Sequence, residues 1–78
     1  MTDEEIRNNI KNNLVKLRKD HEKTQVDIAI YTGKKPPSVA SWEQGKSLPD
    51  LQTLYRLALY YNKTLEYFYK DNGGDDHE

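Results

Sequence analysis

Residues 24–33 are Thr-Gln-Val-Asp-Ile-Ala-Ile-Tyr-Thr-Gly, a segment with a helix start signal at one end and a helix stop signal at the other. Thr24 is a good N-cap residue, and Asp27 follows it three positions later, where a carboxylate can accept from the cap's own amide. Gly33 suits the left-handed conformation that ends many helices. The stretch therefore predicts a helix of only two turns with a sharp stop.

Residues 34–45 continue Lys-Lys-Pro-Pro-Ser-Val-Ala-Ser-Trp-Glu-Gln-Gly. Pro36 suits the first position of a helix, where no amide has to donate. We expect this helix to end at about Glu43, before Gly45. Two short helices joined by a tight turn predict a helix-turn-helix unit, the geometry that presents its second helix to the DNA major groove.

Three more helices are predicted around this unit, and their inward stripes follow from periodicity. A capping box at residues 2–5 opens a helix that should run to about His21, Asp50 caps a fourth, and Thr64 caps a fifth that ends near Lys70. No segment alternates with period two, so the fold class is all-α. The predicted stripes are Ile6, Ile10, Leu14 and Leu17, then Leu51, Leu54, Leu57, Ala58 and Tyr61, then Leu65 and Phe68.

The chain's near-neutral charge argues against a nucleic-acid partner until the charges are placed along it. Its 78 residues include 12 basic and 13 acidic side chains. All 12 basic residues lie within residues 6–70 together with six acidic ones, so this body carries +6. The acidic tail, residues 71–78, is expected to be disordered. It either keeps the chain in solution or weakens non-specific binding by repelling phosphate.

Composition excludes several classes of protein. A chain this short forms one domain, and without cysteine it has neither a disulfide framework nor a cysteine-based metal site. Its longest apolar run, residues 57–61, is far below the roughly 20 residues of a membrane span. Ser38, Ser41 and His21 suggest no nucleophile-base pair. We therefore expect a cytoplasmic protein that is not an enzyme and has no cofactor, metal, membrane or small-molecule substrate.

The sequence resembles the lambda-repressor/Cro-like helix-turn-helix family (XRE) over about residues 14–68. The resemblance rests on Thr24-Gln25-Val26-Asp27-Ile28-Ala29, Gly33, Val39, Trp42-Glu43-Gln44-Gly45-Lys46-Ser47-Leu48-Pro49 and Leu57-Ala58. It implies a compact five-helix DNA-binding domain over residues 1–70, with helices two and three as the helix-turn-helix. It also implies a transcriptional regulator, typically a repressor, that is nucleoid-associated in a prokaryote or encoded by a phage.

The resemblance further implies which residues would meet double-stranded DNA. Adjacent prolines depart from the polar residues that the family often has at the start of this helix. They exclude bidentate base readout there, and they either contact a thymine methyl group or only stiffen the helix. The residues expected at base edges are Lys35, Pro36, Pro37, Ser38 and Ser41, and those expected at phosphates are Gln25, Lys34 and Lys46.

Arg18 and Glu43 match a pair that, in the family, commonly forms a partly buried ion pair holding the recognition helix. The alternative is a solvated surface pair, whose contribution to stability would be small.

Five of the six tyrosines lie in the last two predicted helices, and some of them do not fit the inward stripes. Most tyrosines suit the edge of a core, but exposed aromatic residues also mark interfaces. We expect a homodimer through Tyr67 and Tyr69, since the family often dimerises through its fifth helix. Ile30 and Tyr31 form a second outward pair that suits a protein partner. The alternative function is therefore an antitoxin-like or other protein-interaction module with weak or lost DNA binding.

Overall fold

The computed structural model describes residues 1–73, and this part of the chain is helical without any strand. The predicted all-α class, with the helix-turn-helix formed by the second and third helices, is confirmed. Of the predicted acidic tail, residues 74–78 lie outside the described residues. The elements are α1 (Asp3–Asp20), α2 (Gln25–Thr32), α3 (Pro36–Glu43), α4 (Leu51–Tyr60) and α5 (Leu65–Tyr69).

Four of the five helices begin at a side-chain cap, which is why their boundaries follow from sequence. Thr2 and Thr24 accept from the amides three residues on, and both caps are completed by a returning carboxylate. Asp50 accepts from the Thr53 amide at 2.8 Å, and Thr64 begins α5 in the same way. Only α3 lacks a side-chain cap. Its start instead depends on two prolines whose fixed φ suits a first helical turn.

One core joins all five helices. Leu57 and Phe68 are completely buried at its centre. Leu51 was predicted to join the inward stripe of α4, and that prediction is wrong, because its side chain is 65% exposed. Leu51 is the first residue of α4 and lies in a row with Tyr55 and Leu59, away from the buried side. The buried apolar residues are Ile10, Leu14, Leu17, Ile28, Ala29, Val39, Trp42, Leu54, Leu57, Ala58, Tyr61 and Phe68.

Amide side chains hold the end of α5 against α1. Asn13 is almost fully buried, and its Nδ2 donates to the carbonyls of Phe68 and Lys70, each at 2.9 Å. Asn72 Nδ2 donates to Asn13 Oδ1 at 3.0 Å and so extends this network beyond α5. This network could not be predicted from the sequence, because a polar residue on an apolar stripe gives no sign of a partner more than 50 positions away.

Several tyrosines lie at the edge of the core, where the sequence predicted most of them. Tyr60, Tyr67 and Tyr69 are partly buried and pack against the core, although they are not on the predicted inward stripes. Tyr67 meets Phe68 edge-on, and the ammonium group of Lys63 lies 4.8 Å from the Tyr67 ring centre. The predicted dimer contact through Tyr67 and Tyr69 stays a prediction.

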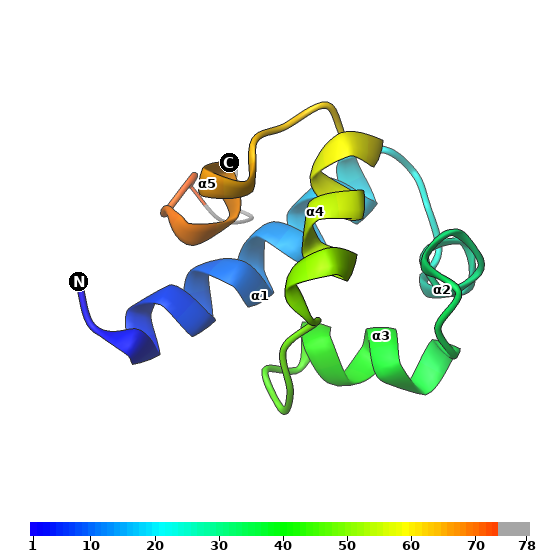
Figure 1. Ribbon diagram of the computed structural model, residues 1–78, viewed down its shortest axis with the longest axis horizontal. Helices are drawn as coiled ribbons and strands as arrows, with labels where there is room; N and C mark the ends of the chain where they lie inside the picture. The colour runs from blue at the N-terminus through cyan, green and yellow to red at the C-terminus, as the bar shows by residue number, and fades with distance from the viewer. Residues whose placement is uncertain (74–78) are drawn as a thin grey trace.

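The arrangement leaves the helix-turn-helix unit projecting from one side of the molecule. Figure 1 shows α1 passing behind α4, with α5 on one side of α4 and the pair α2 and α3 on the other. The outer side of α3 is therefore clear of α5, whereas its inner side is held by the core through Val39 and Trp42.

Candidate nucleic-acid interface

The turn between α2 and α3 fixes how the recognition helix α3 is presented. Gly33 has φ 73°, and its left-handed conformation lets the Lys34 amide donate back to the Ala29 carbonyl at 3.0 Å. Ala29 and Val39 are both buried, so the two helices approach closely at this point. The side of α3 opposite Val39 is then left for a ligand.

The N-terminus of α3 offers few hydrogen-bond donors. Pro36 and Pro37 are exposed and have no backbone N–H. The amide of Ser38 already donates to the Lys35 carbonyl at 2.9 Å. The first turn of α3 can therefore make apolar contact and present the Lys35 and Ser38 side chains, but it cannot hold an anion through a row of free amides.

Ser41, predicted to meet a base edge, is tied to the loop that follows α3. Its Oγ lies 2.8 Å from the Oγ of Ser47, and its carbonyl accepts from the Lys46 amide at 3.0 Å. One hydroxyl of the serine pair donates to the other, so each keeps unused hydrogen-bonding capacity for a further ligand. Sequence reasoning gave Ser47 no role, although it lies within the matched motif.

Exposed lysines flank both ends of α3. Lys34 lies before the helix, and its Nζ is 3.5 Å from Asp50 Oδ2. This ion pair is solvent-exposed, because its side chains are 41% and 55% exposed. Lys35 and Lys46 are exposed and, within residues 1–73, have no ion-pair partner. Three positive charges are thus placed around one helix, where they can meet phosphate groups on either side of a groove.

Gln25, predicted to hold a phosphate, is the first residue of α2. Its Nε2 donates to Glu43 Oε1 at 3.0 Å, so the end of α3 positions this side chain. An amide nitrogen carries two hydrogens, and the second remains for another acceptor. The hydroxyl of Thr24 is occupied as the cap of α2, accepting from the Asp27 amide at 3.0 Å.

The carboxylate of Glu43 also binds Arg18. This one side chain of α3 therefore contacts both α1 and α2. Arg18 Nε lies 2.7 Å from Oε2, and Nη2 lies 3.0 Å from Oε1. The two side chains are only 15% and 8% exposed, so this pair is not a solvated surface pair. Arg18 Nη1 also donates to the Lys23 carbonyl in the α1–α2 turn at 2.9 Å. Its hydrogen bond to Glu43 raises the pKa of Arg18.

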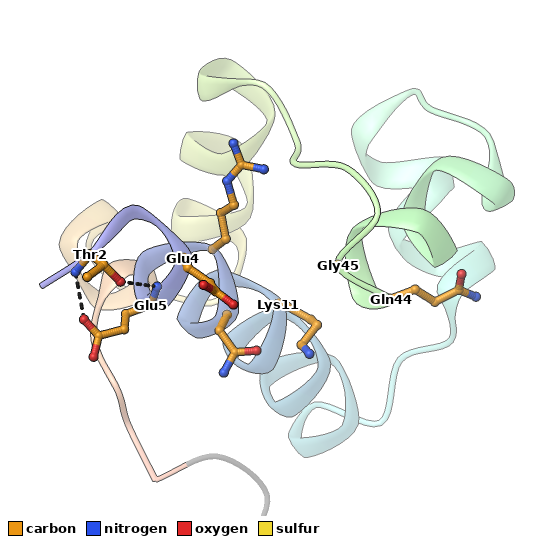
Figure 2. Close-up of a pocket in the computed structure, with 8 residues that line it drawn as sticks. Thr2, Glu4, Glu5, Lys11, Gln44 and Gly45 are labelled. Atoms are coloured by element: carbon orange, nitrogen blue, oxygen red, sulfur yellow. Dashed lines mark hydrogen bonds between the residues drawn. The ribbon is translucent and has the colours of Figure 1, made fainter.

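A cleft of about 470 Å³ separates the N-terminal half of α1 from the end of α3. Figure 2 shows Lys11 of α1 beside Gly45, with Glu4 and Glu5 on the preceding part of α1. Gly45 has φ 77°, and a Cβ there would lie 3.2 Å from Lys11 Cδ. Glycine is therefore favoured both by the backbone conformation and by the close approach of α1. The lining of this cleft therefore carries both acidic and basic side chains.

Comparison with known proteins identifies the family. The helix-turn-helix family matches residues 14–68, which include all of α2, α3 and α4. The chain belongs to the lambda-repressor/Cro-like helix-turn-helix family. No curated protein and no solved structure matches the chain significantly. The family is one of DNA-binding regulators rather than enzymes.

The helix-turn-helix domain brings some predicted contact residues together and holds others in internal contacts. Lys35, Pro36 and Pro37 share the open start of α3, whereas Gln25 and Ser41 have partners within the fold. None of the helices formed by residues 1–73 has the length and hydropathy needed to cross a bilayer.

Proposed function

We propose that this protein is a sequence-specific transcriptional repressor that inserts α3 into the major groove of an operator. The observation that carries the proposal is the open face of α3, flanked by exposed Lys34, Lys35 and Lys46 on a scaffold held by the buried Arg18–Glu43 pair. Occupying the operator would repress transcription by excluding other proteins from it. We place the protein in the cytoplasm, on the chromosome of a prokaryote or on phage DNA.

The contacts divide into those that position the protein and those that read sequence. Gln25, Lys34 and Lys46 are proposed to hold phosphates, since an amide hydrogen or an ammonium group remains available on each. Base edges would meet the side chains on the open face of α3. These are Lys35, Pro36, Pro37, Ser38 and Ser41.

The prolines shape this readout. Pro36 and Pro37 are exposed at the start of α3, so their rings are free to contact a thymine methyl group. If the rings only stiffen the helix, replacing Pro37 with Ala will leave discrimination among operator variants unchanged. If they contact the methyl group, the same substitution will reduce discrimination at an A·T pair, and uracil in place of that thymine will have the same effect.

A homodimer would bind two half-sites about 34–36 Å apart, one helical turn of DNA. The two-fold symmetry of such a complex predicts a pseudo-palindromic operator. Tyr67 and Tyr69 are the residues that the sequence analysis proposed for the contact, and both retain partial exposure.

A titration against a library of genomic fragments, followed by anisotropy on the selected site at several salt concentrations, tests the function. We expect specific binding to exceed binding to random DNA by about 10³-fold or more and to weaken steeply with salt. Equal affinity for all fragments, or affinity that does not depend on salt, would contradict the proposal.

A protein-interaction module is the second candidate, favoured by the apolar outer side of α2. Val26 is 51% exposed and Ile30 is 75% exposed, one turn apart on this helix. An antitoxin-like protein would bind its partner through such a surface. A stoichiometric partner that co-purifies with the wild type and is lost in Ile30→Lys, but retained in a Lys34→Ala control, would support this candidate.

A further inference from the structure

The side of α1 that faces the end of α3 carries a lysine next to the segment that follows the recognition helix. Lys11 lies so close to Gly45 that a Cβ on residue 45 would be 3.2 Å from Lys11 Cδ. Because Lys46 is the next residue, α1 brings a second cation to the segment that holds a proposed phosphate contact. The phosphate contacts proposed for Gln25, Lys34 and Lys46 include none from α1.

The stem of Lys11 is packed, whereas its charge is available. The side chain is partly buried, with Cδ beside the backbone of residue 45. A lysine packed along its stem keeps its ammonium group in water. Within residues 1–73 this ammonium group has no ion-pair partner. Glu43 lines a hollow of about 210 Å³ together with Lys11, but both of its carboxylate oxygens already accept from Arg18 or Gln25.

The cleft between α1 and the end of α3 is divided by charge along α1. Glu4 and Glu5 lie in the first turn of α1, and the Glu5 carboxylate is held in the capping box. Lys11 lies about two turns further along the helix, toward Gly45 (Figure 2). A polyanion is therefore repelled by the start of α1 and attracted to the part of the cleft that adjoins the end of α3.

We propose that Lys11 is a further phosphate contact, through which α1 holds the DNA strand that passes the end of α3. The proposal rests on the proposed function, since it adds a backbone contact to the same interface. Lys11 and Lys46 bind phosphates of one strand from two separate elements. The Gln44 side chain lines the same cleft, and its amide can donate to a phosphate oxygen between them. Because the Arg18–Glu43 pair joins α1 to the end of α3, a strand held by α1 also restricts how α3 lies in the groove.

The variant Lys11→Met tests the proposal on a duplex of random sequence, so no operator has to be known. Methionine keeps an unbranched stem over Gly45 and removes the charge. We expect the slope of log K against log salt to fall by about 1, so that a fourfold rise in salt weakens the wild type about 3.5-fold more than the variant. Lys11→Arg keeps the charge and should keep the wild-type slope. Circular dichroism checks that every variant is folded.

The matched control is Lys63→Met, which removes one charge from the segment between α4 and α5. This segment lies at the end of α4 opposite to α3 (Figure 1). The control should keep the wild-type slope. A slope that Lys11→Met leaves unchanged, or that Lys63→Met lowers by the same amount, would overturn the proposal.

Acetylation of lysine amines, read by mass spectrometry, gives a second measurement on the wild-type chain. An excess of random duplex should slow acetylation of Lys11 and Lys46 and leave that of Lys63 unchanged, whereas a rate at Lys11 that the duplex does not alter would overturn the proposal. If Lys11 is protected but no operator is selected, the proposed function fails and this contact stands. If an operator is bound with Lys11 unprotected, the reverse holds, and binding to no DNA of any sequence would refute both.

Discussion

Arg18 and Glu43 meet through two parallel hydrogen bonds of 2.7 and 3.0 Å, which join the last turn of the domain's first helix to the last residue of its recognition helix. The same carboxylate accepts from Gln25 at the start of α2. One buried carboxylate at the end of α3 therefore binds side chains from two other helices and helps to fix the orientation of α3, together with the core packing of Val39 and Trp42.

Removing this acid should destabilise the whole domain. Glu43→Ala leaves the Arg18 guanidinium buried without a counter-charge, and we expect a loss of about 3–5 kcal/mol in the free energy of unfolding. Glu43→Gln keeps one acceptor and should lose less. Urea titration monitored by circular dichroism measures both. The control Glu66→Ala removes a 71% exposed acid and should change stability by less than about 1 kcal/mol.

The serine pair predicts a shared effect on sequence readout. Ser41→Ala and Ser47→Ala each break the 2.8 Å contact, so we expect both to reduce discrimination at one base step by a similar factor. Random-DNA affinity should change little. In a double-mutant cycle the two effects should overlap rather than add. Full additivity, or equal losses on operator and random DNA, would show that the pair does not serve base readout.

Phosphate contacts predict a different pattern. Lys46→Ala should weaken binding to every DNA sequence and lower the slope of log K against log salt by about 1. Gln25→Ala should also weaken binding to all sequences but leave the slope unchanged, since glutamine carries no charge. Lys70→Ala removes the same charge at the residue that follows α5, and it serves as the control because α5 lies away from α3 (Figure 1). An identical slope change in that control would assign the effect to net charge alone.

The helix cap at Asp50 predicts a loss of stability in acid. Hydrogen bonds from the side chain and the backbone of Thr53 lower the pKa of Asp50 in the folded protein. The cap is therefore fully stabilising above the unfolded-state pKa of about 4, and its contribution is lost as the pH falls from there through the folded pKa. Asp50→Asn should have the same free energy of unfolding as the wild type near pH 7, because asparagine also caps helices. As the pH falls below about 4, the variant should lose less stability than the wild type. Urea unfolding across this range measures the difference.

The buried amide of Asn13 should contribute more to the free energy of unfolding than its small size suggests. Asn13→Ala leaves the buried Phe68 carbonyl without its side-chain donor, whereas the Lys70 carbonyl keeps Asn72, and we expect a loss of about 1–3 kcal/mol in the free energy of unfolding. Asn12→Ala changes the neighbouring exposed asparagine and is the matched control. Thermal unfolding of the two variants should differ by many degrees. Equal melting temperatures would show that water replaces the amide at no cost.

The helices could be predicted because their signals are local. Thr24, Gly33 and Asp50 each act within four residues of their own position, so the sequence around them is enough to place a helix end. Contacts between residues that are distant in sequence were harder to predict. The expected environment of Leu51 was wrong and Asn13 was missed, because both depend on which element packs beside them in the folded chain.

In the candidate site, too, local features could be predicted from the sequence, whereas contacts between side chains could not. The positions of Lys34, Lys35 and the prolines around α3 follow from the motif, and the structure places them on an open face. The contacts that orient Gln25 and Ser41 join residues 18 and six positions apart across a loop or between helices. Such contacts depend on rotamers and backbone placement, which residue types and spacing do not specify.

The amide network between α1 and α5 also bears on how fast the domain forms. Asn13 and Phe68 are 55 positions apart, whereas the helix-turn-helix unit joins neighbours along the chain. Closing so long a loop carries a large entropic cost before any bond rewards it, and distant contacts slow folding. We infer that α2 and α3 pair early and that docking of α5 onto Asn13 completes folding, so a ribosome-bound chain gains its final packing only after residue 72 has emerged.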